Sequence, residues 1–252
     1  MTLTVGPSAD GKGAREVKVT PVASEQQLRH YNWVSDNRAK VAKATGGKVA
    51  YIYLPDTSLG GSTRFNREFY AQVGKEGAII DERFNGGGSL ADQVIDALAR
   101  TPRNYASTRE GEDTVSPRGI FGPKVMIINE SAGSGGDYMP YTFRQAKLGK
   151  LVGKKTWGGL VGIGGYPTLL DGSSVTAPHW ALWFPNGKCD VENIGVAPDV
   201  EVEMDPKAWR ALSTDICRGE RGGRTSTLQM TGATMPVLRR IKVAGSAQAS
   251  ER

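Results

Sequence analysis

Apolar residues along the chain occur in two patterns that alternate with one another. Short continuous apolar runs are typical of strands buried on both faces, whereas apolar residues spaced four apart are typical of one face of a helix. The alternation predicts an α/β core. The predicted strands cover 49–54, 78–84 and 124–128, and the predicted helices cover 62–73, 90–98 and 138–148.

Further elements flank this core. Asp171-Gly172 is a strong hairpin signal, because its residues tolerate the positive φ that tight hairpin turns require. The turn-rich segment Gly6–Gly13 separates two more apolar runs. Outside the core, strands are predicted at 3–5, 17–22, 166–170, 173–177 and 181–184, and a helix is predicted within 24–44.

Two Gly-rich turns each follow a predicted strand and precede a predicted helix. The first is Asn85-Gly86-Gly87-Gly88, and the second is Gly133-Ser134-Gly135-Gly136. Free N–H groups and the dipole at a helix N-terminus favour negative charge, so a serine held there can serve as a nucleophile. If the two turns are neighbours, their N–H groups can converge on one oxyanion beside Ser134. The alternatives are plain tight turns or a phosphate-binding loop, and neither common phosphate-loop pattern fits these residues.

Four motifs occur in the order and spacing of one known family. They are Arg83-Phe84-Asn85-Gly86-Gly87-Gly88, Asn129-Glu130-x-Ala132-Gly133-Ser134, Thr156-Trp157-Gly158-Gly159-x-Val161-Gly162-Ile163 and Val191-Glu192-Asn193-x-Gly195-Val196-x-Pro198-Asp199-Val200. Together they resemble the C-terminal catalytic region of tricorn-type serine peptidases, relatives of the C-terminal processing proteases, from about residue 28 to about residue 206. The resemblance implies an α/β fold with the superhelical ββα core shared with ClpP and crotonase relatives, preceded by a partial PDZ-like segment.

The same resemblance predicts how the chain is organised. Residues 1–22 correspond to the remnant of a PDZ-like domain, 23–47 to a helical connector and 48–212 to the serine peptidase core domain. Residues 213–252 are rich in Arg, Gly, Ser and Thr where relatives have a regular amphipathic helix, so a poorly ordered tail is expected. A frameshift or a non-native ending is one hypothesis for this tail.

Residues of this chain match four functional positions of the family. Ser134 falls on the nucleophile, and Glu192 falls on the acidic member of the catalytic tetrad, which orients and polarises the histidine. A fixed counter-charge there makes physical sense, because an imidazolium forms beside the nucleophile. The N–H of Gly135 falls on one oxyanion-hole donor, where the archaeal tricorn peptidase has an aspartate. Gly88 falls on the other donor, with an uncertainty of one position that brings in Gly87.

The catalytic histidine is the missing member of this set. In the family it lies well upstream, in a subdomain that precedes the PDZ-like domain. The chain has two histidines, His30 and His179, and neither matches that position. We therefore interpret the chain as the C-terminal half of a longer peptidase or as a natural short form. Because a general base contributes about 10²–10⁴-fold, little or no peptidase activity is expected of the chain in isolation.

The primary specificity pocket is a second departure from the family. The archaeal enzyme has an aspartate in this pocket, which suits basic side chains. The matching position in this chain is Ala106, which follows Tyr105. An uncharged pocket favours apolar residues, because burying an unpaired ammonium is costly. Asp113 and Glu112 are close enough in sequence to supply charge from another angle.

Composition and charge exclude several classes of partner. With 252 residues and 38% hydrophobic content, the chain can bury a substantial core. The net charge of +6 is scattered and does not interleave with aromatic residues, so nucleic-acid binding is not expected. No stretch of the sequence has the ~20 apolar residues that a membrane span needs, so no membrane partner is expected. Cys189 and Cys217 belong to no cluster, which predicts no metal site and a reduced compartment.

Three functions remain open from the sequence. The first is a serine endopeptidase core that hydrolyses peptides through an acyl-enzyme on Ser134, in the cytoplasm unless a longer parent chain carries a signal peptide. The second is a non-catalytic peptide-binding or assembly module of the same fold. The third is a crotonase-type acyl-CoA enzyme, because that fold also aims two N–H groups at a thioester oxyanion. No cofactor is implied, and homo-oligomers are an expectation from the resemblance.

Overall fold

The computed structural model describes residues 1–111 and 113–203 of the chain. The chain divides into two compact units, Met1–Ala39 and a larger unit that begins at Lys40. The first unit contains two short antiparallel strands, and a long helix begins in the first unit and ends in the second. These elements are β1 (Thr2–Val5), β2 (Arg15–Lys18) and α1 (Gln26–Thr45).

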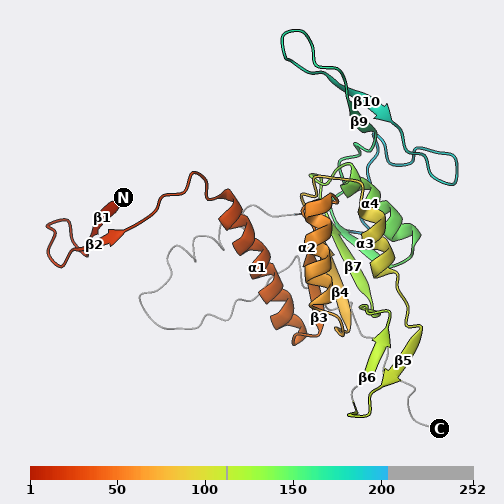
Figure 1. Ribbon diagram of the computed structural model, residues 1–252, viewed down its shortest axis with the longest axis horizontal. Helices are drawn as coiled ribbons and strands as arrows, with labels where there is room; N and C mark the ends of the chain where they lie inside the picture. The colour runs from red at the N-terminus through yellow and green to blue at the C-terminus, as the bar shows by residue number, and fades with distance from the viewer. Residues whose placement is uncertain (112, 204–252) are drawn as a thin grey trace. The chain divides into compact units, whose positions relative to one another are not determined.

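The larger unit is built on a five-stranded sheet whose strands are all parallel (Figure 1). Its order is β11-β8-β7-β4-β3, so successive strands step across the sheet in one direction. Right-handed connections that step in one direction place their helices on one face of the sheet, and the helices that connect these strands form this layer. The strands are β3 (Val49–Tyr53), β4 (Gly77–Asp81), β7 (Lys124–Ile128), β8 (Gly149–Gly153) and β11 (Val200–Glu201), and the helices are α2 (Leu59–Tyr70), α3 (Ala91–Leu98) and α4 (Gly135–Gln145).

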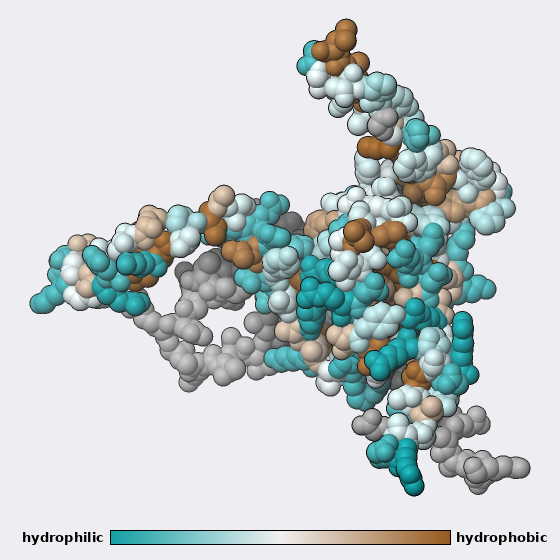
Figure 2. All heavy atoms as spheres, viewed as in Figure 1, coloured by the Kyte–Doolittle hydropathy of each residue, from teal (hydrophilic) through white to brown (hydrophobic). Residues whose placement is uncertain are grey.

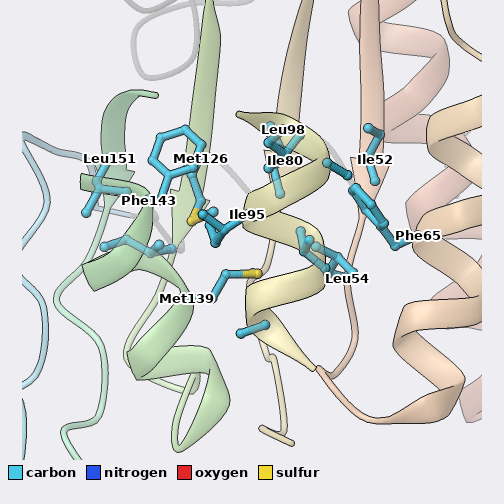
Figure 3. Close-up of a cluster of buried hydrophobic side chains, with 14 of the residues drawn as sticks. Ile52, Leu54, Phe65, Ile80, Ile95, Leu98, Met126, Met139, Phe143 and Leu151 are labelled. Atoms are coloured by element: carbon cyan, nitrogen blue, oxygen red, sulfur yellow. The ribbon is translucent and has the colours of Figure 1, made fainter. Parts of the chain in front are cut away.

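The main hydrophobic core lies between the sheet and this helix layer (Figure 3). Alternate residues of each strand face the helices, because successive side chains of a strand point to opposite faces. Phe65 and Phe69 of α2 stack with their ring centroids 5.1 Å apart, and both are buried. The strands contribute Ile52, Leu54, Ile80, Met126 and Leu151 to this core, and the other two helices contribute Ile95, Leu98, Met139 and Phe143.

The opposite face of the sheet is also buried, although several of its side chains are polar. The Tyr51 hydroxyl donates to Asp81 Oδ2 at 2.6 Å, and Arg83 Nε donates to Asp81 Oδ1 at 2.9 Å. Burial, followed by the nearby charge of Asp81, raises the pKa of Tyr53 to about 12. Burial on both faces explains the nearly continuous apolar runs from which these strands were predicted.

Side chains at the end of α2 and just beyond it close the free edge of β3. The Tyr51 N–H donates to Gln72 Oε1 at 3.1 Å, and Gln72 Nε2 donates to the Tyr51 carbonyl at 3.0 Å. The Tyr53 N–H donates to Glu68 Oε2 at 2.9 Å. An edge whose backbone groups are already hydrogen-bonded is a poor template for a further strand. The sheet therefore ends at β3.

Two antiparallel hairpins belong to the larger unit. The first, β5 (Asn104–Ser107) with β6 (Asp113–Ser116), lies between α3 and β7 and was not predicted from the sequence. The second, β9 (Gly162–Gly165) with β10 (Thr176–Trp180), contains the predicted Asp171-Gly172 turn. Apolar side chains gather at the tip of this second hairpin (Figure 2), where Leu170 is fully exposed.

The predicted core elements are confirmed, with bounds shifted by up to a few residues. The strand predicted at 173–177 is confirmed as β10 with its bounds shifted by three residues, whereas 166–170 is not a strand, because the Leu169 N–H donates to the Ser173 carbonyl at 2.8 Å and closes a compact loop before strand pairing begins. The segment 181–184 is not a strand either, since the Phe184 N–H donates within a turn to the Lys188 carbonyl at 2.9 Å. The predicted tail, 213–252, lies outside the described residues. None of the helices in the described part of the chain has the length and hydropathy needed to cross a membrane.

Candidate active site

The Gly-rich turns that follow β4 and β7 lie side by side at the carboxyl edge of the sheet. The Gly133 N–H donates to the Asn85 carbonyl at 3.1 Å, which ties one turn to the other. A Cβ atom added at Gly87 would lie 2.7 Å from Ser134 Cβ and 3.1 Å from Ser134 Oγ. Only glycine allows this close approach. The glycine triplet is therefore in contact with Ser134.

Ser134 precedes the first residue of α4 and has a strained backbone. Its φ of 56° and ψ of −117° lie outside the regions that serine ordinarily occupies. Its N–H donates to the Gly159 carbonyl at 3.0 Å and to Asp137 Oδ2 at 2.9 Å. Positive φ recurs at Phe84 (67°), beside the triplet, and at Asn193 (58°), beside Glu192. Strain of this kind clusters at functional sites, so its concentration in the motif segments favours a site at this edge.

Two N–H groups close to Ser134 have no hydrogen-bond acceptor among the described residues, namely those of Gly88 and Gly135. The Gly87 N–H, by contrast, donates to Asn85 Oδ1 at 2.9 Å. A Cβ atom added at Gly135 would lie 2.9 Å from the Gly88 nitrogen, so the two residues adjoin. Of the two alternatives for the second oxyanion donor, the geometry favours Gly88.

Thr57 packs against Gly88 and Gly135 and was not singled out from the sequence. Its N–H donates to the Gly87 carbonyl at 2.8 Å, and its carbonyl accepts the Leu90 N–H at 2.8 Å. Its Oγ1 is buried without a hydrogen-bond partner. A Cβ atom added at Gly135 would lie 2.1 Å from this oxygen and 2.3 Å from the Gly88 carbonyl oxygen. This chain therefore requires glycine at 135.

Residues 156–161, which we call the site loop, are held on one side by a buried carboxylate. Asp137 lies in the first turn of α4 and is 0% exposed. Its Oδ1 accepts the Gly158 N–H at 2.7 Å, and its Oδ2 accepts the Gly159 N–H at 3.1 Å. Burial raises the pKa of Asp137, and hydrogen bonds from Thr156 and from the backbone N–H groups oppose that rise. Asp137 is thus a buried acid with both oxygens hydrogen-bonded.

The other side of the site loop is held by Glu192. Its Oε2 accepts the N–H groups of Leu160 and Val161, both at 2.6 Å. Its Oε1 accepts no hydrogen bond from the described residues, and the side chain is half-buried. No hydrogen bond joins Glu192 to Ser134 among the described residues, and the Ser134 N–H instead donates to the Gly159 carbonyl of the loop. The site loop therefore connects the two residues that the family motifs single out.

Glu82 is a second buried acid beside the glycine triplet. It is 0% exposed, its Oε2 accepts Asn85 Nδ2 at 3.3 Å, and its Oε1 has no hydrogen-bond partner. Burial raises the pKa of Glu82 well above its ordinary value, and the charges of Asp137 and Asp81 raise it further. The Asn85 hydrogen bond acts in the opposite direction. Burial and the neighbouring charges thus favour the neutral form of Glu82.

Both histidines of the chain lie outside the Gly-rich turns and the site loop. His30 lies in the first unit, where its ring is 5.7 Å from that of Trp33 between centroids. The His179 ring lies within its own hairpin, because a Cβ atom added at Gly164 would be 2.5 Å from His179 Cγ. Among residues 1–111 and 113–203, no three His, Cys, Asp or Glu side chains are grouped as metal ligands would be.

Tyr105 and Ala106, the predicted pocket residues, lie on the exposed strand β5. The β5–β6 hairpin connects the end of α3 with the start of β7, and it therefore leaves the sheet at its amino edge (Figure 1). Ser134 follows β7 at the carboxyl edge. The fold of one chain thus does not bring these two residues beside Ser134.

The sequence interpretation missed the buried polar residues that surround the site. They are Thr57, Glu82 and Asp137. Asp137 carried a usable signal, since an acid three residues after a serine at a helix start fits a capping pattern. Thr57 and Glu82 carried none, because their burial depends on segments far away in the sequence.

Comparisons with known proteins agree with the four motifs. A family model described as Peptidase family S41 matches residues 48–202. Tricorn protease homolog 1 of Streptomyces coelicolor is 38% identical over 211 residues, which are 81% of this chain and 19% of that protein. Tricorn protease of Thermoplasma acidophilum is 38% identical over 202 residues, which are 79% of this chain and 19% of that protein.

The solved structure of the tricorn protease is similar to this fold, with a TM-score of 0.72 at 35% sequence identity. The similarity covers 81% of this chain and 21% of that chain. This chain therefore spans about a fifth of the length of the curated relatives it matches.

Proposed function

Because the chain belongs to peptidase family S41, we propose that it forms the catalytic core of a serine peptidase with Ser134 as the nucleophile. The observation that carries the proposal is the contact between Ser134 and the glycine triplet, beside two N–H groups that lack an acceptor among the described residues. A strained serine next to uncommitted N–H groups is the arrangement that acyl transfer needs.

The proposed reaction uses these groups in order. Ser134 Oγ attacks the carbonyl carbon of a peptide bond while a base takes the hydroxyl proton, and the carbonyl electrons move onto oxygen. The N–H groups of Gly88 and Gly135 donate to that oxyanion. Collapse breaks the C–N bond, and the base returns the proton to the departing amine. Water then attacks the acyl ester, and Oγ leaves with a proton again supplied by the base.

We propose that the base is a histidine from an upstream segment of a longer chain or of a separate chain. Glu192 is suited to orient it, because Oε2 is fixed on the site loop while Oε1 accepts no hydrogen bond from the described residues. A fixed carboxylate stabilises the imidazolium that forms during attack. On this proposal the isolated chain is weakly active or inactive.

Finer features of the family belong to the same proposal. The parallel sheet with one helix layer is then the ClpP/crotonase-like core, and the β1–β2 hairpin is the remnant of a PDZ-like domain. The tricorn relatives are named as proteases, so peptides are the proposed substrates. Homo-oligomers and a cytoplasmic location remain proposals of the same kind.

The test is covalent labelling of the purified chain with a fluorophosphonate, with the adduct located by mass spectrometry. The probe loses fluoride as its phosphorus bonds to Oγ, and free imidazole added at tens of millimolar substitutes for the absent base. We expect labelling at Ser134 that rises with imidazole. Ser134→Ala is expected to lose it, whereas Ser131→Ala, which changes an exposed serine of the same turn, is expected to keep it.

Absence of labelling in a folded sample, with or without imidazole, would contradict the nucleophile assignment. Peptide binding without labelling would then favour the non-catalytic module, and coenzyme A binding would favour the crotonase-type alternative.

A further inference from the structure

We infer that Asp137 is a positioning residue that joins the nucleophile turn and the site loop into one unit. The inference rests on the proposed function only in taking Ser134 as the nucleophile and Glu192 as the acid that orients the base. Asp137 itself touches no reacting atom, and it acts through the backbone of the residues around it.

The first observation is the number of groups that one buried carboxylate holds. Oδ2 of Asp137 accepts the Ser134 N–H at 2.9 Å and the Gly159 N–H at 3.1 Å, and Oδ1 accepts the Gly158 N–H at 2.7 Å. Hydrogen bonds to an ionised acceptor are stronger than those between neutral groups. The carboxylate thus fixes the Ser134 backbone and two consecutive residues of the site loop together.

The second observation is that each N–H group of the site loop is hydrogen-bonded. Asp137 and Glu192 each accept two consecutive N–H groups from it, and backbone carbonyls accept the other two. The donors and acceptors are Thr156 to Val196 O (3.2 Å), Trp157 to Ala132 O (2.9 Å), Gly158 and Gly159 to Asp137, and Leu160 and Val161 to Glu192. The loop therefore cannot shift toward one carboxylate without breaking hydrogen bonds to the other.

The third observation concerns which backbone N–H groups remain free to bind a substrate oxyanion. The Ser134 N–H is used twice, by Asp137 and by the Gly159 carbonyl, which holds the strained φ of 56°. No N–H of the site loop remains for a substrate oxyanion, and within residues 1–111 and 113–203 the uncommitted N–H groups beside Ser134 are those of Gly88 and Gly135. Asp137 thereby sets both the place of the nucleophile and its separation from Glu192.

A simpler role for Asp137 is to cap α4, since acids in the first turn stabilise helices through the dipole. Capping predicts amide shifts that are confined to α4 and to the N–H groups that Asp137 accepts. Positioning predicts that the effect of losing the carboxylate travels along the site loop to Leu160 and Val161, which Asp137 does not contact. The two roles can therefore be separated by measurement.

The experiment records amide NMR spectra and fluorophosphonate labelling rates, in imidazole, for the full chain and for Asp137→Asn. The matched control is Asp92→Asn, which removes a carboxylate from the first turn of α3 that accepts the Tyr138 hydroxyl of α4 at 2.9 Å. We expect Asp137→Asn to shift the amides of Ser134, Gly158 and Gly159 and also those of Leu160 and Val161. Labelling should fall by at least about tenfold, and Asp92→Asn should leave both readouts at the wild-type values.

Unchanged Leu160 and Val161 amides in folded Asp137→Asn would overturn the inference. If that variant does not fold, Glu192→Gln tests the unit from its other end and must shift the amides of Gly158, Gly159 and Ser134. A wild-type chain that never labels would end the proposed function, and the amide measurements would still decide whether the loop and the nucleophile turn move as one unit.

Discussion

The two Gly-rich turns at the carboxyl edge of the sheet follow similar strands and precede similar helices, yet they are held in different ways. In the turn that contains Ser134, both oxygens of Asp137 accept hydrogen bonds from backbone N–H groups. Beside the glycine triplet, Glu82 has one oxygen bonded to Asn85 Nδ2 at 3.3 Å and the other without a partner. One turn is therefore held by a buried carboxylate whose two oxygens both accept backbone hydrogen bonds, and the other lies beside an acid for which burial favours the neutral form.

This difference indicates which kind of substitution should disrupt each turn. The nucleophile turn depends on charge, because three backbone N–H groups converge on Asp137. The triplet turn depends on the absence of side chains at its glycines, because Cβ atoms at Gly87 or Gly88 would lie within 2.7 Å of neighbouring atoms. Loss of a carboxylate should disturb the first turn, and added bulk or added charge should disturb the second.

The largest effect is expected where both turns meet, at Gly135. In Gly135→Ala the new methyl group would lie 2.1 Å from Thr57 Oγ1 and 2.3 Å from the Gly88 carbonyl oxygen, so the turns must separate. Labelling of Ser134 should fall by about 10²-fold, the size associated with a lost oxyanion-hole donor. The rate of fluorophosphonate labelling in imidazole measures it.

The matched control for that change is Gly60→Ala, in the first turn of α2. A Cβ atom there would lie 3.8 Å from Asp56 Oδ2, an ordinary contact, so labelling should stay at the wild-type rate. Equal rates for Gly135→Ala and wild type would show that the two turns are not packed against each other in solution.

A smaller effect, dependent on pH, is expected of Glu82→Gln. The folded state raises the pKa of Glu82 above its ordinary value of 4.5, so the stability linked to this group is complete below that value and is lost as pH rises through the raised pKa. The glutamine side chain does not ionise, so the variant does not lose this stability as pH rises. Its free energy of unfolding should therefore fall less steeply with pH than that of the wild type.

Urea unfolding at a series of pH values from about 4.5 upward measures that slope. The control is Glu76→Gln, which neutralises an exposed glutamate paired with Lys48 at 3.0 Å and should keep the wild-type slope. An unchanged slope in Glu82→Gln would mean that Glu82 is not the buried neutral acid that its surroundings imply.

The comparison also separates what the sequence could predict from what it could not. Local patterns were enough to predict the core strands, the three helices and the position of Ser134 between strand and helix. They could not predict that Asp137 accepts N–H groups from a loop about twenty residues farther along the chain, because a carboxylate and its distant donors meet only after folding. The strands of β9–β10 were misplaced for a related reason, since turn residues mark a reversal without fixing where pairing starts.

The smallest effect is expected on the face of the sheet that is turned away from α2, α3 and α4. In Tyr51→Phe, Asp81 loses a 2.6 Å hydrogen bond and keeps three from Arg83, one from its backbone N–H at 3.2 Å and two from its guanidinium at 2.9 and 2.5 Å. A buried acceptor that retains strong partners should cost about 1 kcal/mol in the free energy of unfolding, with Ser134 labelling unchanged. Tyr53→Phe, which removes a hydroxyl that donates to the Arg83 carbonyl at 3.2 Å, is the control for loss of a hydroxyl from the same face. A labelling rate that falls in Tyr51→Phe and not in Tyr53→Phe would show that Asp81, at the end of β4, helps to hold the triplet turn, and the contrast between the two turns would then extend through the sheet.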